Sequence, residues 1–208
     1  MKKEDVLPIV FSCADAYLEN LSGHTLLFIC SDKHKNLYAV EVTFNASSFL
    51  HMTGLKTNNI SAKDFLKRCK KRRLSTKDFN LDKSGFVEMK LKILPMLMHK
   101  NLSAKMIGNI YEYKPMLYTE KLAGNIQGCM GFKTDSKTGV YVPNTVIKDD
   151  IKNCVDHPDR IILTYRKKQN ETFFSELVYT AKNIDWENIK LPKGYENLPL
   201  PKLEPNAE

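Results

Sequence analysis

Hydrophobic and polar residues alternate along this chain with two different periods, and these periods predict its elements. Residues 4–20 carry apolar side chains at helical spacing, which predicts an amphipathic helix that ends at Ser22-Gly23. Residues 24–30 form an apolar run and residues 37–44 alternate with period two, so both segments are predicted to be strands. The polar residues between them indicate a hairpin.

The segment after the hairpin, Phe49-Leu-His-Met-Thr-Gly-Leu, combines an imidazole and a hydroxyl with large apolar residues. If this segment is extended, Phe49, His51 and Thr53 share one face, because side chains along a strand alternate. Gly54 allows the backbone to turn there or to approach a ligand closely. A dense basic run follows, with six cations in residues 67–73. We therefore expect an active-site edge that acts on an anionic substrate.

Residues 61–100 favour helices more than strands. Ser61 is a favourable N-cap with Asp64 in the capping-box position, which predicts a helix through about residue 72. A shorter helix is predicted from residue 75 to near residue 81. Residues 86–93 alternate like a strand whereas residues 94–98 suit a helix, so we expect a strand-like entry followed by a helix.

Beyond residue 105 the pattern changes to β. Strands are predicted over residues 106–113, 122–132, 140–147, 160–167 and 173–180, with a short helical link at 149–152. Gly124, Gly128 and Gly131 indicate bulges or close backbone approach, and Pro143 marks an edge or a bulge. The short connections require antiparallel neighbours. The predicted fold class is α+β, with a mainly helical N-terminal half packed on an antiparallel sheet of about 4–5 strands in the C-terminal half.

Composition narrows the class of partner more than it narrows the fold. The 208 residues carry a net charge of +8, which favours a polyanionic partner, although a solvated lysine-rich surface gives the same charge. The five cysteines are widely spaced without a zinc pattern, which favours free thiols in a reduced compartment. Neither a signal peptide nor a membrane-spanning run is visible. We expect a cytoplasmic protein without a membrane partner, and the oligomeric state stays open.

Two groups of residues are candidates for catalysis. His51 with Thr53 suits general acid–base chemistry, because an unperturbed imidazole titrates near neutral pH. The alternative for His51 is a buried histidine of the core. Asn144-Thr145 follows Pro143 directly and places polar groups where an apolar strand breaks, which is often where a cleft opens. The alternative for this pair is an ordinary Asx turn.

Basic and polar side chains of the sheet and of the basic run are candidates for substrate binding. They are Lys121, Asn125, Arg160, Tyr165, Lys167, Lys70, Arg72 and Arg73. A solvated strand face is the alternative for Arg160 and Lys167. A helix distributes the cations of residues 67–73 around more than one face, so they cannot all contact one ligand.

The chain has no Walker loop, dinucleotide fingerprint, HExxH or Gly-x-Ser-x-Gly motif. No carboxylate cluster indicates a two-metal nuclease. We therefore expect neither a metal nor a cofactor. On RNA, the 2′-hydroxyl would attack the adjacent phosphorus while His51 or a lysine moves the proton. Arginine or lysine side chains would stabilise the charge of the phosphorane.

Several short segments together resemble one known family, in the same order along the chain. They are residues 49–54, 61–65, 74–75, 78–79, 90–95, 119–125, 131–132, 141–145 and 160–162. Over roughly residues 45–182, the chain thus resembles the phage-type Barnase–EndoU–Colicin E5/D–RelE-like nucleases of phages and mobile elements.

This resemblance implies a metal-independent, RNA-binding hydrolase of the toxin or effector type, with helices followed by a curved antiparallel sheet. It divides the chain into an N-terminal helix and hairpin (1–44), a nuclease domain (45–182) and a Pro-rich tail (183–208), which we expect to be extended or disordered. The family's polar motif residues fall by position on His51, Thr53, Lys121, Asn125, Asn144, Thr145 and Arg160. The expected partners are RNA and an immunity or host target protein.

Two other classes of function remain open. The first is an ADP-ribosyltransferase-like toxin that uses NAD, for which Glu176 near Tyr179 is a weak candidate for the catalytic glutamate. The second is a non-catalytic basic module from a phage or mobile element that binds nucleic acid or protein. In the second class the basic residues matter and His51 does not.

Overall fold

A computed structural model describes residues 1–81, 84–111 and 118–201 of the chain. The first predicted elements are confirmed: α1 (Lys3–Asn20) is followed by the hairpin of β1 (His24–Ser31) and β2 (Leu37–Thr43). The buried face of α1 is formed by Val6, Val10, Cys13 and Tyr17 at helical spacing. The periodic pattern therefore fixed these three elements correctly.

β1 is the strand on which the rest of the fold is assembled. One edge pairs with β2 and the other edge pairs with β9 (Asp159–Lys168), which lies about 130 residues further along the chain. Its central residues from Thr25 to Cys30 are buried on both faces. A strand buried on both faces has a continuous apolar sequence, which is the pattern that this segment shows.

The second half of the chain supplies the other strands of the main sheet. They are β5 (Met106–Asn109), β6 (Lys121–Gly124), β7 (Cys129–Thr134), β8 (Tyr141–Ile147) and β10 (Glu176–Thr180). The strand order is β1-β2-β8-β7-β6-β5-β9-β10, and β1 also pairs with β9. The pairings therefore close into a ring. On the edge of β9 opposite β1, β5 pairs with residues 159–160 and β10 pairs with residues 163–166. One junction of the ring is parallel, a single pair between Val42 and Tyr141.

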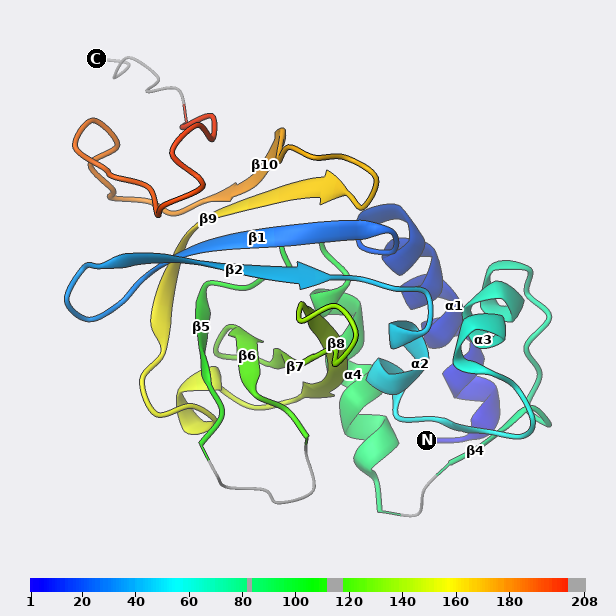
Figure 1. The fold of residues 1–208 in the computed structure, drawn as a ribbon. Coiled ribbons are helices and arrows are strands. Elements are labelled where there is room, and N and C mark those ends of the chain that lie inside the picture. Colours follow the sequence, from blue (N-terminus) through cyan, green and yellow to red (C-terminus); the bar gives the residue numbers. More distant parts are fainter. Residues whose placement is uncertain (82–83, 112–117, 202–208) are drawn as a thin grey trace, which may run out of the picture.

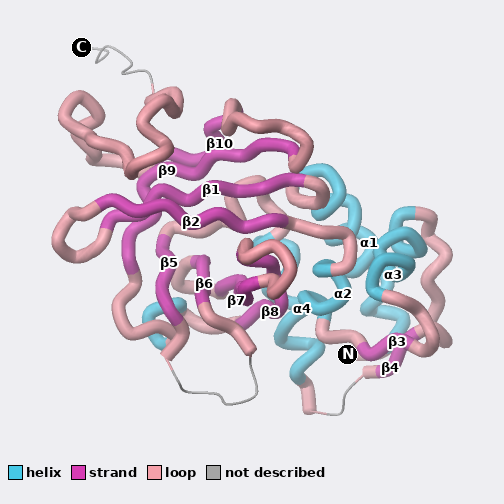
Figure 2. The backbone as a smooth tube through the Cα atoms, in the orientation of Figure 1, coloured by secondary structure: helices cyan, strands magenta, loops and turns pink. Residues whose placement is uncertain are grey.

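Most of the other elements gather on one side of this sheet, as Figures 1 and 2 show. They are α2 (Ser48–Thr53), α3 (Ala62–Lys70), α4 (Phe86–Leu97) and the two-stranded pair β3 (Lys56–Thr57) and β4 (Phe79–Asn80). The short 3-10 helix η1 (Ile151–Asn153) lies apart from them, against β6. α2 packs against β8, α3 and α4, so it occupies the junction between the helices and the sheet.

The predicted fold class was wrong. The structure is mostly sheet: eight strands form one mixed sheet, and the described residues contain four α-helices, where a helical half on a sheet of about 4–5 strands was expected. The error arose because β1 and β2 were assigned to a separate extension. Alternation identifies a strand but does not identify its partner, and the partners of this hairpin lie in the C-terminal half. The first 44 residues therefore share one sheet and one core with the rest.

Several local predictions also need correction. Residues 75–81 form a turn closed by Asp78, whose carboxylate accepts from Ser75, and then β4, so no helix forms there. Residues 86–97 are helical throughout. The strand-like alternation would place Met89 on the same face as Val87 and Leu91, but Met89 is 48% exposed whereas those two are buried. The strand predicted over 122–132 is a hairpin of β6 and β7. Tyr113, which was assigned to the preceding strand, lies outside the described residues.

Other local predictions are confirmed. Ser61 caps α3 by accepting from the Asp64 backbone N–H at 3.1 Å, and its hydroxyl donates to the Asp64 carboxylate at 2.7 Å. None of the five cysteines forms a disulfide, and four of the five are buried. No helix in the described part of the chain is long and apolar enough to cross a membrane.

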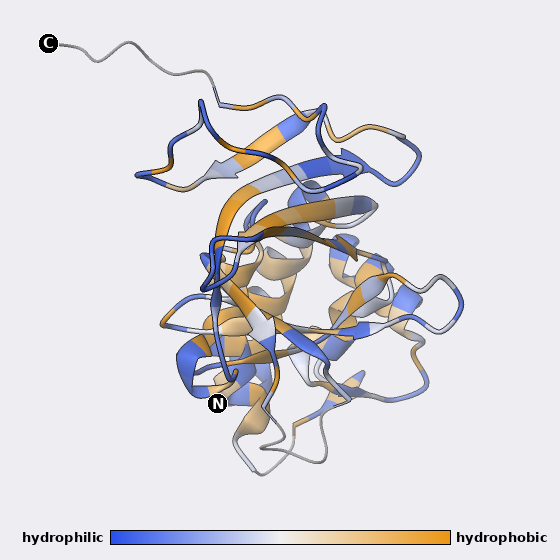
Figure 3. Cartoon of the chain, turned by 60° about the vertical axis from the view of Figure 1, so that its left-hand side comes forward, coloured by the Kyte–Doolittle hydropathy of each residue, from blue (hydrophilic) through white to orange (hydrophobic). Residues whose placement is uncertain are grey.

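Two main apolar clusters lie on opposite faces of β1. Leu26, Phe28 and Cys30 point into the larger cluster beneath the helices, whereas Leu27 and Ile29 point into a second cluster. Figure 3 shows apolar residues concentrated in the helices and in the strands, whereas the loops are mostly hydrophilic. The second cluster needs a cover, because the helices lie on the other face.

The cover comes from the C-terminal segment that the sequence predicts as an extended arm. Residues 182–201 contain no helix or strand, yet their apolar side chains pack on the second cluster. The Tyr195 hydroxyl donates to Glu41 at 2.6 Å, and the Tyr165 hydroxyl donates to the Pro199 carbonyl at 2.9 Å. These bonds hold an irregular segment against the outer side of the sheet.

Gly124 should be the glycine least tolerant of a side chain in the β6–β7 hairpin. A Cβ at this position would lie 2.5 Å from the Cys129 Cα, so β6 and β7 would have to separate. We expect Gly124→Ala to lower the free energy of unfolding by about 2 to 3 kcal/mol in urea titrations. Gly139→Ala is the control: its φ of +70° disfavours alanine, but no atom lies within 4 Å, so a loss of about 1 kcal/mol is expected. Equal losses in the two variants would contradict this explanation.

Candidate active site

Lys90 is the lysine around which several of the predicted site residues gather. It lies on α4, three residues after Val87 and four before Leu94, and therefore within the apolar stripe of that helix. The helix packs this stripe against the core, and Lys90 is only 6% exposed. Lysine is almost never buried to this degree unless it is paired.

The contacts of the Lys90 ammonium group are polar but uncharged. Its Nζ donates to the Thr145 hydroxyl at 2.9 Å and to the His51 carbonyl at 3.4 Å, and it lies 4.9 Å from the centre of the Phe86 ring. Within the described residues no carboxylate forms an ion pair with it. Burial without a counter-charge lowers the pKa of Lys90 to about 8.

Gly54 ends α2 and permits the approach of Lys90. Its φ of +72° is the left-handed conformation that favours glycine at a helix end. A Cβ there would lie 2.9 Å from the Lys90 Cδ. Both the backbone conformation and the lysine stem therefore favour glycine, and the turn that the sequence predicted at this position is confirmed.

The segment around His51 is helical, so the expectation for an extended segment was wrong about its faces. In α2 the side chains of Phe49 and Thr53 are buried together, whereas His51 is exposed on the other side. The Thr53 hydroxyl donates to the Leu50 carbonyl and accepts from the Leu55 backbone N–H. This hydroxyl stabilises the end of α2 and is not presented to solvent.

The His51 imidazole is in an electropositive setting. Partial burial of the ring lowers its pKa, and the charges of Lys133 and Lys90 lower it further. The side chain is therefore neutral at neutral pH while it stays accessible to solvent. A neutral, accessible imidazole is able to accept a proton.

The predicted break at Pro143 is present as a register shift between β7 and β8. Gly131 pairs with Thr145 and Phe132 with Pro143, so Asn144 is the extra residue. The Asn144 amide donates to the Tyr118 carbonyl at 2.8 Å and its oxygen accepts from the Thr119 hydroxyl at 3.1 Å. The break thus aims Thr145 at Lys90 and ties Asn144 to the segment before β6.

Together these contacts bring α2, α4 and the β8 break to one place. The Lys90 ammonium contacts both the His51 backbone and the Thr145 hydroxyl, so His51 and the break lie on the same side of the molecule. The buried Lys90 ammonium, with its lowered pKa, and the Thr145 hydroxyl contact each other there, and the neutral His51 imidazole lies on the exposed side of α2 within the influence of the Lys90 charge. This set is suited to moving protons and stabilising negative charge.

Lys121 lies in a different place, a pocket of about 450 Å³. Its Nζ donates to the Asn109 side chain at 2.6 Å, and burial lowers its pKa. The Tyr38 hydroxyl donates to Asp159 at 2.6 Å in the same pocket, which His34 and His157 also line. Two pairs of functional groups in this pocket are thus bonded to each other, Lys121 with Asn109 and Tyr38 with Asp159.

Four other predicted residues do not join the Lys90 cluster. Asn125 bonds the Ser103 carbonyl and the Gln127 backbone, and therefore fixes a loop. Arg160 donates to the Lys182 carbonyl. Tyr165 is fully buried, and burial raises its pKa to about 12. Lys167 lies 4.4 Å from the centre of the Phe174 ring.

The basic run spreads over more than one face, as the helical geometry predicts. Lys70 is exposed at the end of α3. Arg72 forms a two-pronged ion pair with Asp15, and its guanidinium lies over the Phe11 ring. Arg73 lines a pocket of about 500 Å³ together with cations of α3. Arg72 is therefore occupied by a structural contact.

Lys90 was not among the functional residues predicted from the sequence, although it is the first residue of one of the segments that carry the family resemblance. The available signal was a lysine in phase with Val87, Leu91 and Leu94 in a segment where helix and strand both fitted the pattern. Only the helical reading places Lys90 on the buried face. The described residues contain no group of three or more His, Cys, Asp or Glu side chains that could hold a metal ion.

The comparison with known proteins is consistent with the resemblance seen in the motifs. Residues 9–183 match the family described as phage-Barnase-EndoU-ColicinE5/D-RelE like nuclease4. No curated protein and no solved structure matches the chain significantly. The match begins within α1, so it includes the β1–β2 hairpin that the motifs had left outside.

The lowered pKa of Lys90 predicts a specific dependence of stability on pH. Between about pH 8 and the usual range of lysine, the unfolded chain binds a proton that the folded chain does not, so this residue makes stability rise with pH. At pH 7 we expect Lys90→Met to be more stable than the wild type by on the order of 2 kcal/mol.

This advantage should shrink as the pH rises from about 8 to 10. The measurement is urea unfolding of both proteins at each pH, and their difference removes the contributions of the tyrosines and cysteines. The matched control is Lys92→Met, because Lys92 lies on the same helix, is exposed and pairs with Glu88. A difference between wild type and Lys90→Met that is constant from pH 7 to 10 would refute a shifted pKa.

Proposed function

We propose that this chain, which belongs to the phage-Barnase-EndoU-ColicinE5/D-RelE like nuclease4 family, cleaves RNA with the Lys90 cluster as its catalytic centre. The family indicates a nuclease. The finer parts of the proposal are the RNA substrate, a reaction without metal and the roles of Lys90, His51 and Thr145. The observation that carries them is a lysine that is 6% exposed and has no carboxylate partner in the described residues.

A buried cation without a counter-ion is costly, so a structure retains it only where the charge is used or is needed for packing. The negative charge of a phosphodiester would supply the missing partner. Thr145 fixes the direction of the Lys90 ammonium, and Gly54 leaves room for its stem. These contacts preorganise the charge before substrate arrives, which is how electrostatic stabilisation of a transition state is achieved.

The proposed reaction divides the proton transfers between His51 and Lys90. The neutral His51 imidazole accepts the proton of the RNA 2′-hydroxyl, and the 2′-oxygen forms a bond to the adjacent phosphorus. The bond from phosphorus to the 5′-oxygen breaks, which yields a 2′,3′-cyclic phosphate. The Lys90 ammonium stabilises the phosphorane oxygens and donates a proton to the leaving 5′-oxygen, and no step uses a metal.

The predicted residues have different roles in this proposal. Thr145, predicted as catalytic, contacts Lys90, and Asn144, also predicted as catalytic, adjoins it at the break in β8. Lys121, predicted to bind substrate, is the candidate centre of a separate site. The transferase alternative has less support, because the Glu176 carboxylate is held by Arg166 and Lys100. A non-catalytic binding module remains the outcome if no turnover is found.

The decisive experiment is cleavage of labelled RNA in EDTA by the wild type, Lys90→Met, Lys90→Arg and the control Lys92→Met. We expect the wild type and the control to cleave equally. Lys90→Met should lose about 100-fold or more in kcat, the range typical of a lost acid or base. Lys90→Arg keeps the positive charge, but arginine does not give up its proton near neutral pH. This variant should therefore keep part of the affinity for RNA while its kcat stays below that of the wild type.

The pH–rate profile separates the two proton transfers. The acidic limb should follow His51 at a pKa below its usual value, and the alkaline limb should follow Lys90 at about 8. His51→Ala should remove the acidic limb and Lys90→Arg the alkaline limb. If Lys121→Met lost activity while the Lys90 variants kept full activity, the catalytic centre would be the Lys121 pocket and not the Lys90 cluster. Cleavage abolished by EDTA, or label transfer from NAD, would reject the mechanism outright.

A further inference from the structure

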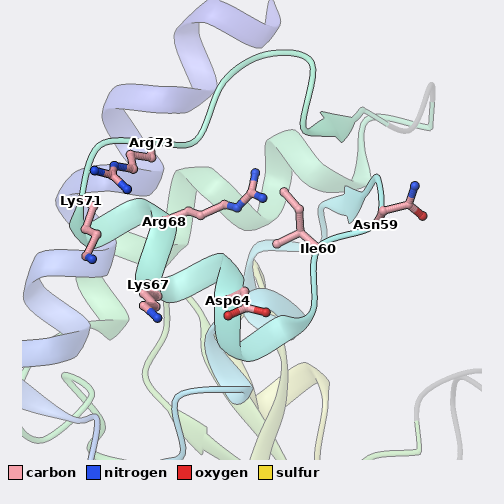
Figure 4. A pocket seen from close by; sticks show the side chains of 7 residues that line it. All are labelled: Asn59, Ile60, Asp64, Lys67, Arg68, Lys71 and Arg73. Carbon is pink, nitrogen blue, oxygen red and sulfur yellow. The ribbon is translucent and has the colours of Figure 1, made fainter.

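A pocket of about 500 Å³ lies beside α3 and is lined mainly by cations. Its lining residues are Asn59, Ile60, Asp64, Lys67, Arg68, Lys71 and Arg73. Figure 4 shows that these side chains come from α3, from the loop before it and from the residues after it. No residue of this pocket belongs to the Lys90 cluster.

The end of α3 explains how four cations come to surround one pocket. The Arg73 backbone N–H bonds to the Arg68 carbonyl and the Arg72 N–H bonds to the Cys69 carbonyl, which together form a Schellman motif. The left-handed position of this motif normally holds glycine, but here it holds Arg72 with a φ of +54°. This turn brings Arg73 back beside Lys71 and Lys67 while it directs Arg72 towards α1.

The strained position of Arg72 is compensated by contacts outside the pocket. Its guanidinium pairs with Asp15, donates to the Cys69 carbonyl and lies 5.0 Å from the centre of the Phe11 ring. A left-handed arginine costs about 1 kcal/mol or more. The fixed Arg72 therefore anchors the turn to α1, and the remaining cations of the run are left for the pocket.

The charges within the pocket are mostly uncompensated. Arg68 pairs with Asp78 at 3.1 Å, and the Asp64 carboxylate is bonded by the Ser61 hydroxyl. Among the described residues no hydrogen bond or ion pair engages the side chains of Lys67, Lys71 or Arg73. Lys67 and Lys71 also stand at i and i+4, a spacing at which like charges repel. An anion in the pocket would relieve this repulsion.

α2 lies between this pocket and the Lys90 cluster. It packs on α3 through Phe49 and Phe65, whose ring centres are 6.0 Å apart, and it packs on β8 and α4 with its other contacts. His51 is on the same short helix. The pocket is lined mainly by exposed side chains of α3 and its flanks, whereas α3 contacts α2 through the buried Phe65. The two positively charged sites therefore lie on different elements, and only a substrate with several phosphates would reach both.

We infer that the pocket formed by Lys67, Arg68, Lys71 and Arg73 is a second phosphate-binding site, which holds the backbone of a polynucleotide away from the bond that is cleaved. The inference rests on the proposed function for the identity of the anion. It predicts that the substrate is an oligonucleotide with several phosphates. It also replaces Lys70 and Arg72, which the sequence favoured as substrate contacts, by Lys67, Arg68 and Lys71.

The test measures binding separately from cleavage. A labelled 2′-O-methyl RNA oligonucleotide cannot undergo 2′-hydroxyl attack, so its affinity can be titrated against salt without turnover. The pocket variant carries Lys67→Gln, Lys71→Gln and Arg73→Gln. The control variant removes the same charge through Lys137→Gln, Lys152→Gln and Lys190→Gln, which are exposed residues on other segments. Circular dichroism and thermal melting verify that both variants fold.

We expect the pocket variant to bind about tenfold more weakly or worse at low salt, and the slope of log K against log salt to fall by about 2, or 0.7 for each lost contact. The control variant should keep nearly the wild-type slope. Equal slopes for the two variants, or no binding by the wild type, would overturn the second phosphate site.

Cleavage of the matching unmodified RNA reports on the proposed function independently. A wild type that cleaves while the pocket variant binds normally would reject the pocket and leave the nuclease intact. A wild type that binds through the pocket without cleaving would reject the nuclease and leave a polynucleotide-binding site.

Discussion

The double burial of β1 is the constraint on which the rest of the structure depends. Its central residues are covered on both faces, so both backbone edges must find strands, because an unpaired buried N–H or C=O group is costly. β2 is supplied by the adjacent turn, but the second edge is satisfied only by β9, far along the chain. This pairing brings the two ends of the sheet together, and the C-terminal segment then covers the second apolar cluster. The ring, the two main clusters and the position of the tail all follow from it.

The same closure creates the setting of Lys90. α2 follows β2 directly, so fixing the hairpin against β9 and β8 also places α2 on β8, where α4 packs against both. Lys90 is thereby enclosed among apolar residues with Thr145 and a backbone carbonyl as its polar partners. This charge has no carboxylate partner among the described residues, and the cost of burying it appears as a lowered pKa. The lowered pKa of Lys90 thus results from packing in the folded protein and not from the residues next to it in sequence.

Local chemistry was predictable wherever a few adjacent residues decide it. The Ser61 cap, the first hairpin, the break at Pro143 and the close approach at Gly131 each depend on short-range rules, and the structure contains each of them. The expectation that Phe49, His51 and Thr53 share one face failed by one choice of period, since an extended segment and a helical turn assign opposite faces to alternate residues. Lys90 was missed for a related reason, because the alternation of residues 87–93 concealed its position in a helical stripe. Both errors concern segments of about one to three turns, in which the two periods are hardest to distinguish.

The sequence by itself determined most of the strands, the capped helix α3, the cysteines without disulfides, the net positive charge and, through its ordered motifs, the nuclease family. These properties depend on local spacing or on composition, and both are present in the unfolded chain. Only the tertiary structure decided that β1 joins β9, that Lys90 meets Thr145 and that Arg72 leaves the basic pocket for Asp15. Each of these contacts joins residues more than 50 positions apart. Such partners are selected by the burial of shared surfaces, and hydrophobic burial is non-directional, so no pattern within one segment records them.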